Sequence, residues 1–578
     1  MRRTAGHDGA MAIARKLLLA VCVLALVAPS SALAQGNGKR KPRPDRWSAV
    51  SVQLLAVNDF HGALEPPTGS GGRIGTVDAG GVEYLATHLR QLESQNRNTT
   101  IVSAGDLIGA SPLLSALFHD EPTIEAMNDL GLDLNAVGNH EFDEGWQELI
   151  RMQQGGCHPT DGCFGGDGFE GAEFGFLAAN VVNAQTGEPI LAPYAIKRYQ
   201  GERIGFIGMT LEGTPTIVSQ SGIQGLQFLD EAETANRYAR ELRRRGVEAI
   251  VVLLHEGGTP ALADPNGCPV SGPIVDIVNR TTDEVDLFIT GHTHQAYACV
   301  IDGRWVTSAS SNGRLITDID LNISRRTGDI SRVAVNNRVV TRDVSRDPFQ
   351  TSLIARYQQL AAPIANRRIG SQTADITRAA DNTGESALGN LIADAQLAAT
   401  DGANEGGAVA ALMNPGGVRA DLTFASSPAG EGNGVITYGE AFTVQPFTNY
   451  LVTMSLTGAD LLAVLKQQWC GQTSPRILSP AGLTYDIDQS VLADATTCSN
   501  AAANPATNVM IGGAPLNPSA TYRITVNSFL ADGGDNFTVL RNGTNRLVGA
   551  IDVDAFEDFL TAAGTVAPPA QDRIDLVP

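Results

Sequence analysis

The chain has 578 residues, of which 43% are hydrophobic and 18% are charged, and its formal net charge is −21 at pH 7. The composition is that of a globular protein, and the length exceeds one ordinary domain, so we expect two domains with separate cores. Because phosphate backbones select basic surfaces, the acidic balance argues against a nucleic-acid polymer as partner. A small anionic substrate is compatible with a locally positive metal site, and nothing in the composition specifies an oligomeric state.

The first 34 residues are predicted to direct export. Arg15 and Lys16 precede an apolar run from Leu17 to Val27, and Ala32-Leu33-Ala34 has the small residues of a cleavage site. The run is too short to span a bilayer comfortably, and no later run predicts a membrane span. We therefore expect a signal peptide over 1–34 with cleavage near Ala34, a disordered lead-in over 35–46, and a secreted protein, extracellular or periplasmic.

Six cysteines follow the predicted signal, an even number that suits an oxidising compartment. Their spacing favours three local disulfides: Cys157–Cys163, Cys268–Cys299 and Cys470–Cys498. The alternative is metal-binding thiolates, which the absence of any Cys-x-x-Cys pair disfavours.

From Trp47 to about Val340, apolar strand-like runs alternate with helical segments, the pattern of an α/β domain. The predicted helices are Gly81–Ser94, Pro122–Leu130 and Glu231–Arg245. We expect a domain over 47–342, followed by a connecting helix within 343–366, where Phe349, Leu353, Ile354, Tyr357 and Leu360 recur at helical spacing. A smaller α/β domain over 367–578 has predicted helices at Glu385–Ala399 and Gly458–Trp469 and a strand at Thr521–Ser528.

Five apolar runs in the first domain each end in polar residues of the kind that bind metals. The runs are Val52–Val57, Ile101–Ala104, Leu132–Val137, Ala249–Leu254 and Val285–Thr290. The polar clusters that follow them are Asn58–Gly62, Gly105-Asp106, Gly138–Asp143, His255–Gly258 and Gly291–His294. Each pattern predicts a buried strand whose end carries ligands, with glycines that let the backbone approach closely.

These clusters contain seven oxygen and nitrogen ligands: Asp59, His61, Asp106, Asn139, His255, His292 and His294. Two divalent cations need about this many protein ligands if one carboxylate bridges them. The absence of cysteine from the clusters disfavours a closed structural zinc site, and zinc, manganese, iron and calcium all stay open. His7, His88, His119 and His158 lack such a context and are interpreted as surface or structural residues.

The five clusters, in this order, resemble the calcineurin-like metallophosphoesterase superfamily, whose pattern is Asp-x-His, Gly-Asp, Gly-Asn-His-Glu/Asp, His and Gly-His-x-His. The resemblance implies an N-terminal αββα sandwich, with one metal on Asp59, His61, Asp106 and His294. It implies a second metal on Asp106, Asn139, His255 and His292, so that Asp106 bridges. His140 would act in catalysis without binding metal, and Asp143 would orient its ring. Asp143 is alternatively the cap of a helix that starts near Glu144.

The second domain offers residues for reading a substrate. Phe447 and Phe529 lie in loops bounded by glycine or proline, where two rings can sandwich a nucleobase. Asp535 can accept hydrogen bonds from a ribose diol, Arg419 can hold phosphate, and Asn414 and Asn449 suit base or phosphate edges. Taken singly, each has an ordinary alternative: a loop phenylalanine packs under its own loop, and Arg419 pairs with Asp421.

Four blocks, which begin at Glu385, Asn414, Pro446 and Asn527, resemble those of the secreted 5′-nucleotidase family, which includes bacterial UDP-sugar hydrolases. The resemblance spans about residues 50–570 and assigns Phe447 and Phe529 to base stacking and Asp535 to ribose. Asn414, Arg419 and Asn449 would be further substrate contacts. The chain departs from the family pattern at one point. Members commonly carry an arginine a few residues before the Leu-Gly-Asn block, whereas this chain has Asp381–Gly384 there, and its nearest arginine is Arg378, further upstream.

The sequence thus predicts an exported two-metal hydrolase that cleaves nucleoside 5′-phosphates by attack of a metal-bound hydroxide. Two enzymatic alternatives on the same scaffold are a 2′,3′-cyclic-nucleotide phosphodiesterase and a nucleotide-sugar pyrophosphatase. An alternative of another class is a nucleotide-binding surface protein with vestigial catalysis, which the complete ligand set and His140 disfavour.

Overall fold

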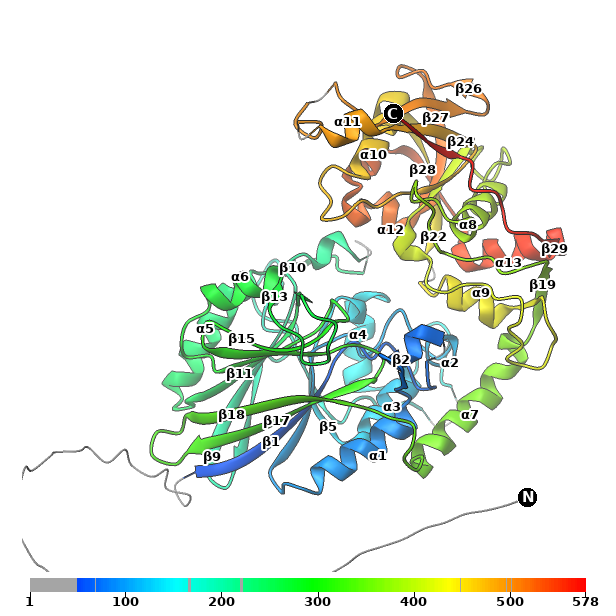
Figure 1. Ribbon diagram of the computed structural model, residues 1–578. Helices are drawn as coiled ribbons and strands as arrows, with labels where there is room; N and C mark the ends of the chain where they lie inside the picture. The colour runs from blue at the N-terminus through cyan, green and yellow to red at the C-terminus, as the bar shows by residue number, and fades with distance from the viewer. Residues whose placement is uncertain are drawn as a thin grey trace, which may run out of the picture. The chain divides into compact units, whose positions relative to one another are not determined.

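The computed structural model of the protein describes residues 49–67, 69–164, 168–218, 222–447, 449–494, 496–500 and 502–578 (Figure 1). The predicted signal peptide and lead-in, residues 1–46, lie outside the described residues. Within the described residues, none of the helices is long and apolar enough to cross a membrane.

Two six-stranded mixed sheets dominate the first part of the chain. The first has the order β18 (Ile330–Val339), β17 (Leu315–Ser324), β1 (Ala49–Val57), β4 (Thr99–Ser103), β5 (Leu132–Ala136) and β6 (Gly175–Leu177). The second has the order β15 (Ala296–Ile301), β16 (Arg304–Ala309), β14 (Leu287–Thr290), β11 (Ala249–His255), β9 (Glu202–Thr210) and β8 (Tyr194–Tyr199). All five apolar runs predicted as strands are strands of these sheets.

The two sheets face each other across one buried aliphatic layer. Leu54 of β1 and Leu134 of β5 share this layer with Val251 and Leu253 of β11. The outer face of the first sheet packs against α1 (Val82–Glu93), α2 (Leu113–Ala116), α3 (Glu121–Leu130) and α4 (Trp146–Gln154). The outer face of the second packs against α5 (Glu231–Arg244) and α6 (Pro273–Arg280). Figure 1 shows strands of both sheets between α1 and α3 on one side and α5 and α6 on the other, so the expected αββα sandwich is confirmed.

The strand directions explain where the site forms. Strands β1, β4, β5 and β6 run parallel, as do β9, β11, β14 and β16. Parallel strands bring their carboxyl ends to the same edge of a sheet, where ligands usually bind. The five polar clusters stand at these ends. Three pairs of short antiparallel strands form separate two-stranded sheets: β2 (Arg73–Ile74) with β3 (Val77–Asp78), β7 (Val181–Asn183) with β10 (Leu226–Phe228), and β12 (Thr259–Pro260) with β13 (Val270–Ser271).

The connecting helix is α7 (Pro348–Ala365), which starts five residues after the predicted range begins. Asp347 caps it by accepting hydrogen bonds from the backbone N–H groups of Phe349 and Gln350, and Pro348 suits the first turn. Leu353, Ile354 and Tyr357 enter the core beneath the first sheet, whereas Phe349 and Leu360, predicted on the same face, are exposed. The helix therefore packs on the sandwich. The described residues form one compact unit, and the domain limits at 342 and 367 stay predictions.

The second part of the chain is a smaller α/β arrangement, as expected. A five-stranded sheet has the order β23 (Ser479–Ala481), β20 (Ala410–Met413), β27 (Thr521–Asn527), β22 (Tyr450–Thr457) and β28 (Thr544–Ile551). A four-stranded sheet has the order β26 (Ala514–Pro515), β25 (Ala506–Ile511), β24 (Leu483–Asp488) and β30 (Ile574–Val577). A three-stranded sheet has the order β21 (Val435–Thr437), β19 (Arg368–Gln372) and β29 (Thr565–Val566).

Helices of this second part are α8 (Ala387–Ala398), α9 (Tyr438–Val444), α10 (Gly458–Gln467), α11 (Gln489–Ala493), α12 (Ser528–Ala531) and α13 (Asp552–Ala563). The predicted helices at 385–399 and 458–469 correspond to α8 and α10 within two residues. Thr457 and Asp460 form a reciprocal capping box at the start of α10, which explains its sharp beginning.

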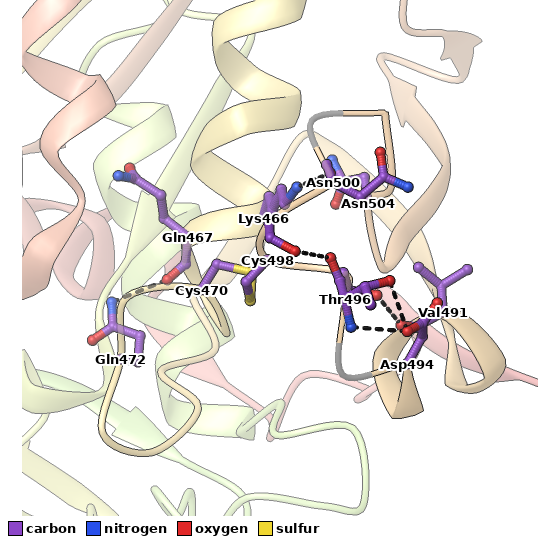
Figure 2. The surroundings of a disulfide bond; sticks show 12 residues. Lys466, Gln467, Cys470, Gln472, Val491, Asp494, Thr496, Cys498, Asn500 and Asn504 are labelled. Carbon is purple, nitrogen blue, oxygen red and sulfur yellow. Dashed lines mark hydrogen bonds between the residues drawn. A yellow bond between two sulfur atoms is a disulfide. The ribbon is translucent and has the colours of Figure 1, made fainter.

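The structure contains the three disulfides that the spacing favoured. Figure 2 shows Cys470, just after α10, bonded to Cys498. Gln472 lies two residues beyond Cys470, and its side chain donates a hydrogen bond of 3.0 Å to the carbonyl of Gln467 (Figure 2). This disulfide anchors a segment that continues into the substrate pocket described below.

Candidate metal centre and substrate pocket

The seven predicted metal ligands come together at the strand ends. The ligand atoms of Asp59, His61 and His294 lie within 4.8 Å of one another, and so do those of Asp106, His255 and His292. A third overlapping set joins His61, Asp106 and His140. Asp106 therefore lies within reach of both groups, which is the position that a bridging carboxylate requires.

The backbone at these ligands is unusual. Asp59, His61, Asp106, His292 and His294 all have a positive φ, between 49° and 71°. Few residues other than glycine adopt this left-handed conformation, and such strain concentrates at functional sites because surrounding structure must enforce it. The glycines between the ligands are needed for space. A Cβ at Gly138 would lie 2.1 Å from Oδ1 of Asp106.

Backbone carbonyls fix the orientation of two imidazoles in the way that metal binding requires. Nδ1 of His61 lies 2.9 Å from the carbonyl of Gly109, and Nδ1 of His255 lies 2.7 Å from the carbonyl of Ala104. Each Nδ1–H donates to its carbonyl, so in the neutral ring Nε2 offers a lone pair to the interior of the site. Nε2 of His255 lies 2.9 Å from Oδ2 of Asp106, yet it is a buried atom that makes no hydrogen bond with the described residues.

This pair of facing acceptors fits a divalent cation. A lone pair opposite a carboxylate oxygen is unfavourable unless a proton or a metal ion lies between them. Burial lowers the pKa of His292 to about 3 and of His294 to about 4, which keeps both rings neutral and able to bind metal. Burial alone would lower the pKa of His255 too, but Asp106 raises it to about 10. The donor set therefore matches metal ions with nitrogen and oxygen ligands.

Two further side chains hold the ligands in place. Glu141 is buried, and its carboxylate accepts hydrogen bonds from the backbone N–H groups of Asp106, Leu107 and Gly138 at 2.6–2.9 Å. The side chain of Asn58 donates a hydrogen bond of 2.5 Å to Asp59. These contacts link adjacent strand ends, so the ligands are positioned by a second layer of hydrogen bonds.

His140 stands beside the metal ligands. Its Nδ1 lies 2.8 Å from Oδ2 of Asp143, and its backbone N–H donates a hydrogen bond of 2.9 Å to Oδ1 of Asp106. Burial opposes the charged ring, but Asp143 and Asp106 outweigh it and raise the pKa of His140 to about 9. The alternative in which Asp143 caps a helix is wrong, because α4 begins at Trp146 with Gly145 at the cap position.

One pocket of about 360 Å³ joins the two parts of the chain. Asn139, His140, Asp143 and His292 line it from the sandwich. All six predicted substrate residues line it from the second part: Asn414, Arg419, Phe447, Asn449, Phe529 and Asp535. Asp59, His61, Asp106, His255 and His294 do not line it. A volume of this size is within the range of small-molecule sites.

The carboxylate of Asp535 is held by a polar network. Asn414 donates a hydrogen bond of 2.9 Å to Oδ2, and Arg476 forms an ion pair with Oδ1. Gln472, on the segment that the Cys470–Cys498 disulfide anchors, donates a hydrogen bond of 2.7 Å to the carbonyl of Asp535. Asn414 in turn accepts a hydrogen bond of 2.9 Å from Asn527, so its amide is committed to protein contacts.

Phe447 lies at the border between the metal ligands and the substrate residues. Its ring is 5.9 Å from that of His140 at an interplanar angle of 18°, and the Arg419 guanidinium lies 5.5 Å from its centroid. Burial lowers the pKa of Arg419, as does the charge of Arg378, while Asp143 and Asp106 raise it. The guanidinium of Arg419 therefore interacts electrostatically with the carboxylates of Asp143 and Asp106.

Phe529 and Asn449 occupy mixed environments. Phe529 lines the pocket, and its ring also packs against Gly534 of its own loop, where a Cβ would lie 2.5 Å from Cζ. Asn449 accepts a hydrogen bond of 3.3 Å from Ser528 and donates one of 3.3 Å to Asp552. Both residues therefore contribute to the pocket wall and to local packing.

Arg378 lies next to the segment that carries Arg419. It is the nearest arginine upstream of the Leu-Gly-Asn block, where family members commonly have one. Its Nη1 donates a hydrogen bond of 3.4 Å to the carbonyl of Val418, and its backbone N–H donates one of 2.8 Å to Asp421. Among the described residues, Arg419 and Asp421 form no ion pair, so that alternative for Arg419 is wrong.

Several residues of the site escaped prediction, and four of them show why. Arg476, Ile217 and Val218 line the pocket, and Glu141 organises the metal ligands. Glu141 adjoins His140 in the sequence, and its position in the cluster was the available signal. The other three lie in loops without a motif, so no local pattern identifies them.

Comparisons with known proteins show which families the chain matches. The family described as calcineurin-like phosphoesterase matches residues 52–296, and the 5′-nucleotidase C-terminal domain matches residues 363–542. The chain is 25% identical to a 5′-nucleotidase of Vibrio cholerae, over 93% of this chain and 96% of the relative. It is similar to the crystal structure of a 5′-nucleotidase precursor from Thermus thermophilus, with 27% identity, a TM-score of 0.71, and coverage of 91% of this chain and 99% of that one.

A third relative is longer. The chain is 33% identical to Endonuclease YhcR of Bacillus subtilis over 92% of this chain, but it spans only 41% of the length of that protein.

The sandwich fold and the matched phosphoesterase domain place the chain among the calcineurin-like phosphoesterases, a class of metal-dependent phosphoester hydrolases. The second matched domain narrows the assignment. The chain belongs to the 5′-nucleotidase family.

Proposed function

We propose that this protein is a two-metal phosphohydrolase that converts nucleoside 5′-phosphates into nucleoside and phosphate. The observation that carries the proposal is the shared pocket, which His140, Asn139 and His292 line together with Phe447 and Phe529. Groups suited to phosphate chemistry and groups suited to a nucleoside thus surround one cavity.

The seven ligands would hold two divalent ions, with Asp106 between them. Two such metal ions would stabilise the charge on the phosphoryl oxygens and activate a water molecule for attack. His140 stabilises the transition state or protonates the leaving oxygen, and Asp143 keeps its ring oriented through the 2.8 Å contact at Nδ1. Arg419, which lines the pocket beside Phe447, would hold a phosphoryl oxygen.

The second part of the chain selects the substrate. Phe447 and Phe529 would stack on a base, an interaction worth about 1–3 kcal/mol per ring. Asp535 would accept hydrogen bonds from the ribose diol, and the side chains of Asn414 and Arg476 fix its carboxylate for that purpose. Asn449, which accepts a hydrogen bond from Ser528, would tie the segment of Phe447 to the segment of Phe529.

Export completes the proposal. The predicted signal over 1–34 would be cleaved near Ala34, and the three disulfides suit the oxidising environment outside the cytoplasm. The protein would thus act on nucleotides outside the cytoplasm, in the medium or the periplasm.

The test is product analysis with the metal-reconstituted mature protein: inorganic phosphate is measured for the monoesters, and the cleavage products of the other substrates are separated by chromatography. AMP, UDP-glucose, 2′,3′-cyclic AMP and p-nitrophenyl phosphate are compared side by side, with a single-stranded oligonucleotide added because one relative is named an endonuclease. We expect AMP to have the highest kcat/KM. If only p-nitrophenyl phosphate were cleaved, the metal-centre assignment would stand and the nucleoside assignment would be wrong. If the oligonucleotide were cleaved best, the proposed class of substrate would be wrong.

A further inference from the structure

A second group of metal-binding side chains lies outside the site described above. The ligand atoms of His119, Glu144, Glu148 and His158, which we call the loop cluster, lie within 4.8 Å of one another. His119 follows α2, Glu148 belongs to α4, and His158 lies in the loop that the Cys157–Cys163 disulfide closes. No motif in the sequence links the two histidines, which lie 39 positions apart.

The two imidazoles are stacked. Their ring centroids are 3.7 Å apart and the rings are inclined by 17°. Two protonated rings would repel each other at this distance, so at least one is expected to be neutral and able to bind a metal. Asp161 lies at the edge of the stack, with Oδ2 2.9 Å from Nε2 of His119 and 3.4 Å from Nδ1 of His158.

Carboxylates surround His119 on both sides. Its Nδ1 lies 2.6 Å from Glu144, and its Nε2 faces Asp161. Burial lowers its pKa, but Glu144 and Asp161 outweigh burial and raise it to about 9. A site that holds a proton between two carboxylates is one in which a metal ion can take the place of that proton.

The cluster carries an excess of negative charge. Arg151 donates hydrogen bonds to Glu148 at 2.6–2.9 Å and to Glu121 at 2.6 Å, so one guanidinium serves two carboxylates. Glu144 and Asp161 share His119 in the same way. A divalent cation would balance the remaining charge.

The surrounding structure preorganises the cluster. The disulfide holds the loop with His158, and Phe164 packs against Phe118 at 5.4 Å. His119 and Asp120 have φ values of 49° and 60°, a conformation that two consecutive residues other than glycine rarely adopt. Fixing the ligands in advance lowers the entropic cost of binding.

We propose that the loop cluster binds a divalent transition-metal ion, separate from the candidate metal centre, that fastens the disulfide-closed loop to the turn carrying Asp143. Two imidazoles and two carboxylates are the ligand set that zinc accepts in four-coordinate sites. Glu144 directly follows Asp143, and a small cavity borders His119, Glu144, His140 and Asp143. The ion would therefore be a structural link near His140 and take no part in the reaction. This inference does not require the substrate assignment proposed above.

The test counts zinc ions. The full mature chain is stripped with a chelator, reloaded with Zn²⁺ alone, desalted and measured by elemental analysis. His158→Gln is expected to hold one zinc ion fewer per chain than the wild type while it keeps its phosphate release. His88→Gln is the matched control, because Nε2 of His88 contacts the carbonyl of Thr341, away from both clusters, and it should hold as much zinc as the wild type.

Equal zinc content in His158→Gln and the wild type would overturn the proposal. A second measurement does not depend on the variant: anomalous diffraction at the zinc edge from wild-type crystals soaked in Zn²⁺. A peak at the nitrogen edges of the His119 and His158 rings, next to Glu144 and Glu148, is expected, and its absence would refute the site. Zinc content and the diffraction peak are both measured without the hydrolysis reaction. A failure of this proposal can therefore be distinguished from a failure of the nucleotidase proposal.

Discussion

Asp106 is the residue on which the two groups of candidate ligands meet. Its Oδ2 lies 2.9 Å from Nε2 of His255 and 3.7 Å from Nε2 of His61, although these two histidines belong to different ligand groups. Its Oδ1 receives the backbone N–H of His140. One carboxylate thus connects both candidate metal positions with the turn that carries the proposed catalytic histidine.

The Asp106→Ala variant is therefore expected to lose both ions of the centre, because the bridging carboxylate belongs to both coordination shells. The measurement is elemental analysis after dialysis. Asp276→Ala, on the exposed face of α6, serves as the control and should keep its metals. If Asp106→Ala retained both central ions, the bridging role would be wrong.

His140→Ala should keep the central metals and lower kcat by about 10²–10⁴-fold, the usual contribution of a positioned acid or base. Asp143→Asn should lower kcat less, because Asp143 acts through the orientation of His140. Steady-state kinetics with AMP, together with metal content, check both variants. An unchanged kcat in His140→Ala would remove this residue from the mechanism.

At this scale the ligands could be predicted, because each of the five polar clusters directly follows an apolar run in the sequence. Arg476 could not. It lies 59 residues before its partner Asp535, in a loop without a motif, and its place depends on how α10 and the following disulfide direct the chain. The strained backbone at Asp59 and Asp106 was equally invisible, since a positive φ at aspartate has no sequence signature apart from the neighbouring glycines.

At the scale of elements, periodicity predicted the helices and strands, whereas local capping decided their ends. The connecting helix was expected within 343–366, but Asp347 and Pro348 set its start. Its apolar spacing also predicted one buried face that included Phe349 and Leu360. Both are exposed, because the sandwich covers only the stripe of Leu353, Ile354 and Tyr357.

The Cys470–Cys498 disulfide links an element to the pocket. The two cysteines are 28 positions apart in the sequence, and their bond closes the loop between them. Replacing both with serine should lower the free energy of unfolding by about 3–4 kcal/mol. Because Gln472 and Arg476 both hold Asp535, the KM for AMP should also rise. Urea unfolding and steady-state kinetics measure the two effects. A loss of stability with an unchanged KM would show that the disulfide does not position Asp535.

At the scale of the whole molecule, the metal ligands and the substrate residues are separated by more than a hundred positions in the sequence but border one pocket. Residue types alone predicted each half of this site. That the two halves face one cavity could be expected only from the family resemblance, because no local pattern specifies how the second part of the chain meets the sandwich. Within the pocket, the two halves meet at the stacked rings of Phe447 and His140.

The central claim is that base stacking and phosphate chemistry act on one substrate in this pocket. The most direct measurement compares kcat/KM for AMP and for p-nitrophenyl phosphate in Phe529→Ala and the wild type, with Phe349→Ala, an exposed residue of α7, as the control. Loss of one stack should lower kcat/KM for AMP by about 5- to 150-fold and leave p-nitrophenyl phosphate unchanged. Equal losses on both substrates, or none on AMP, would contradict the account.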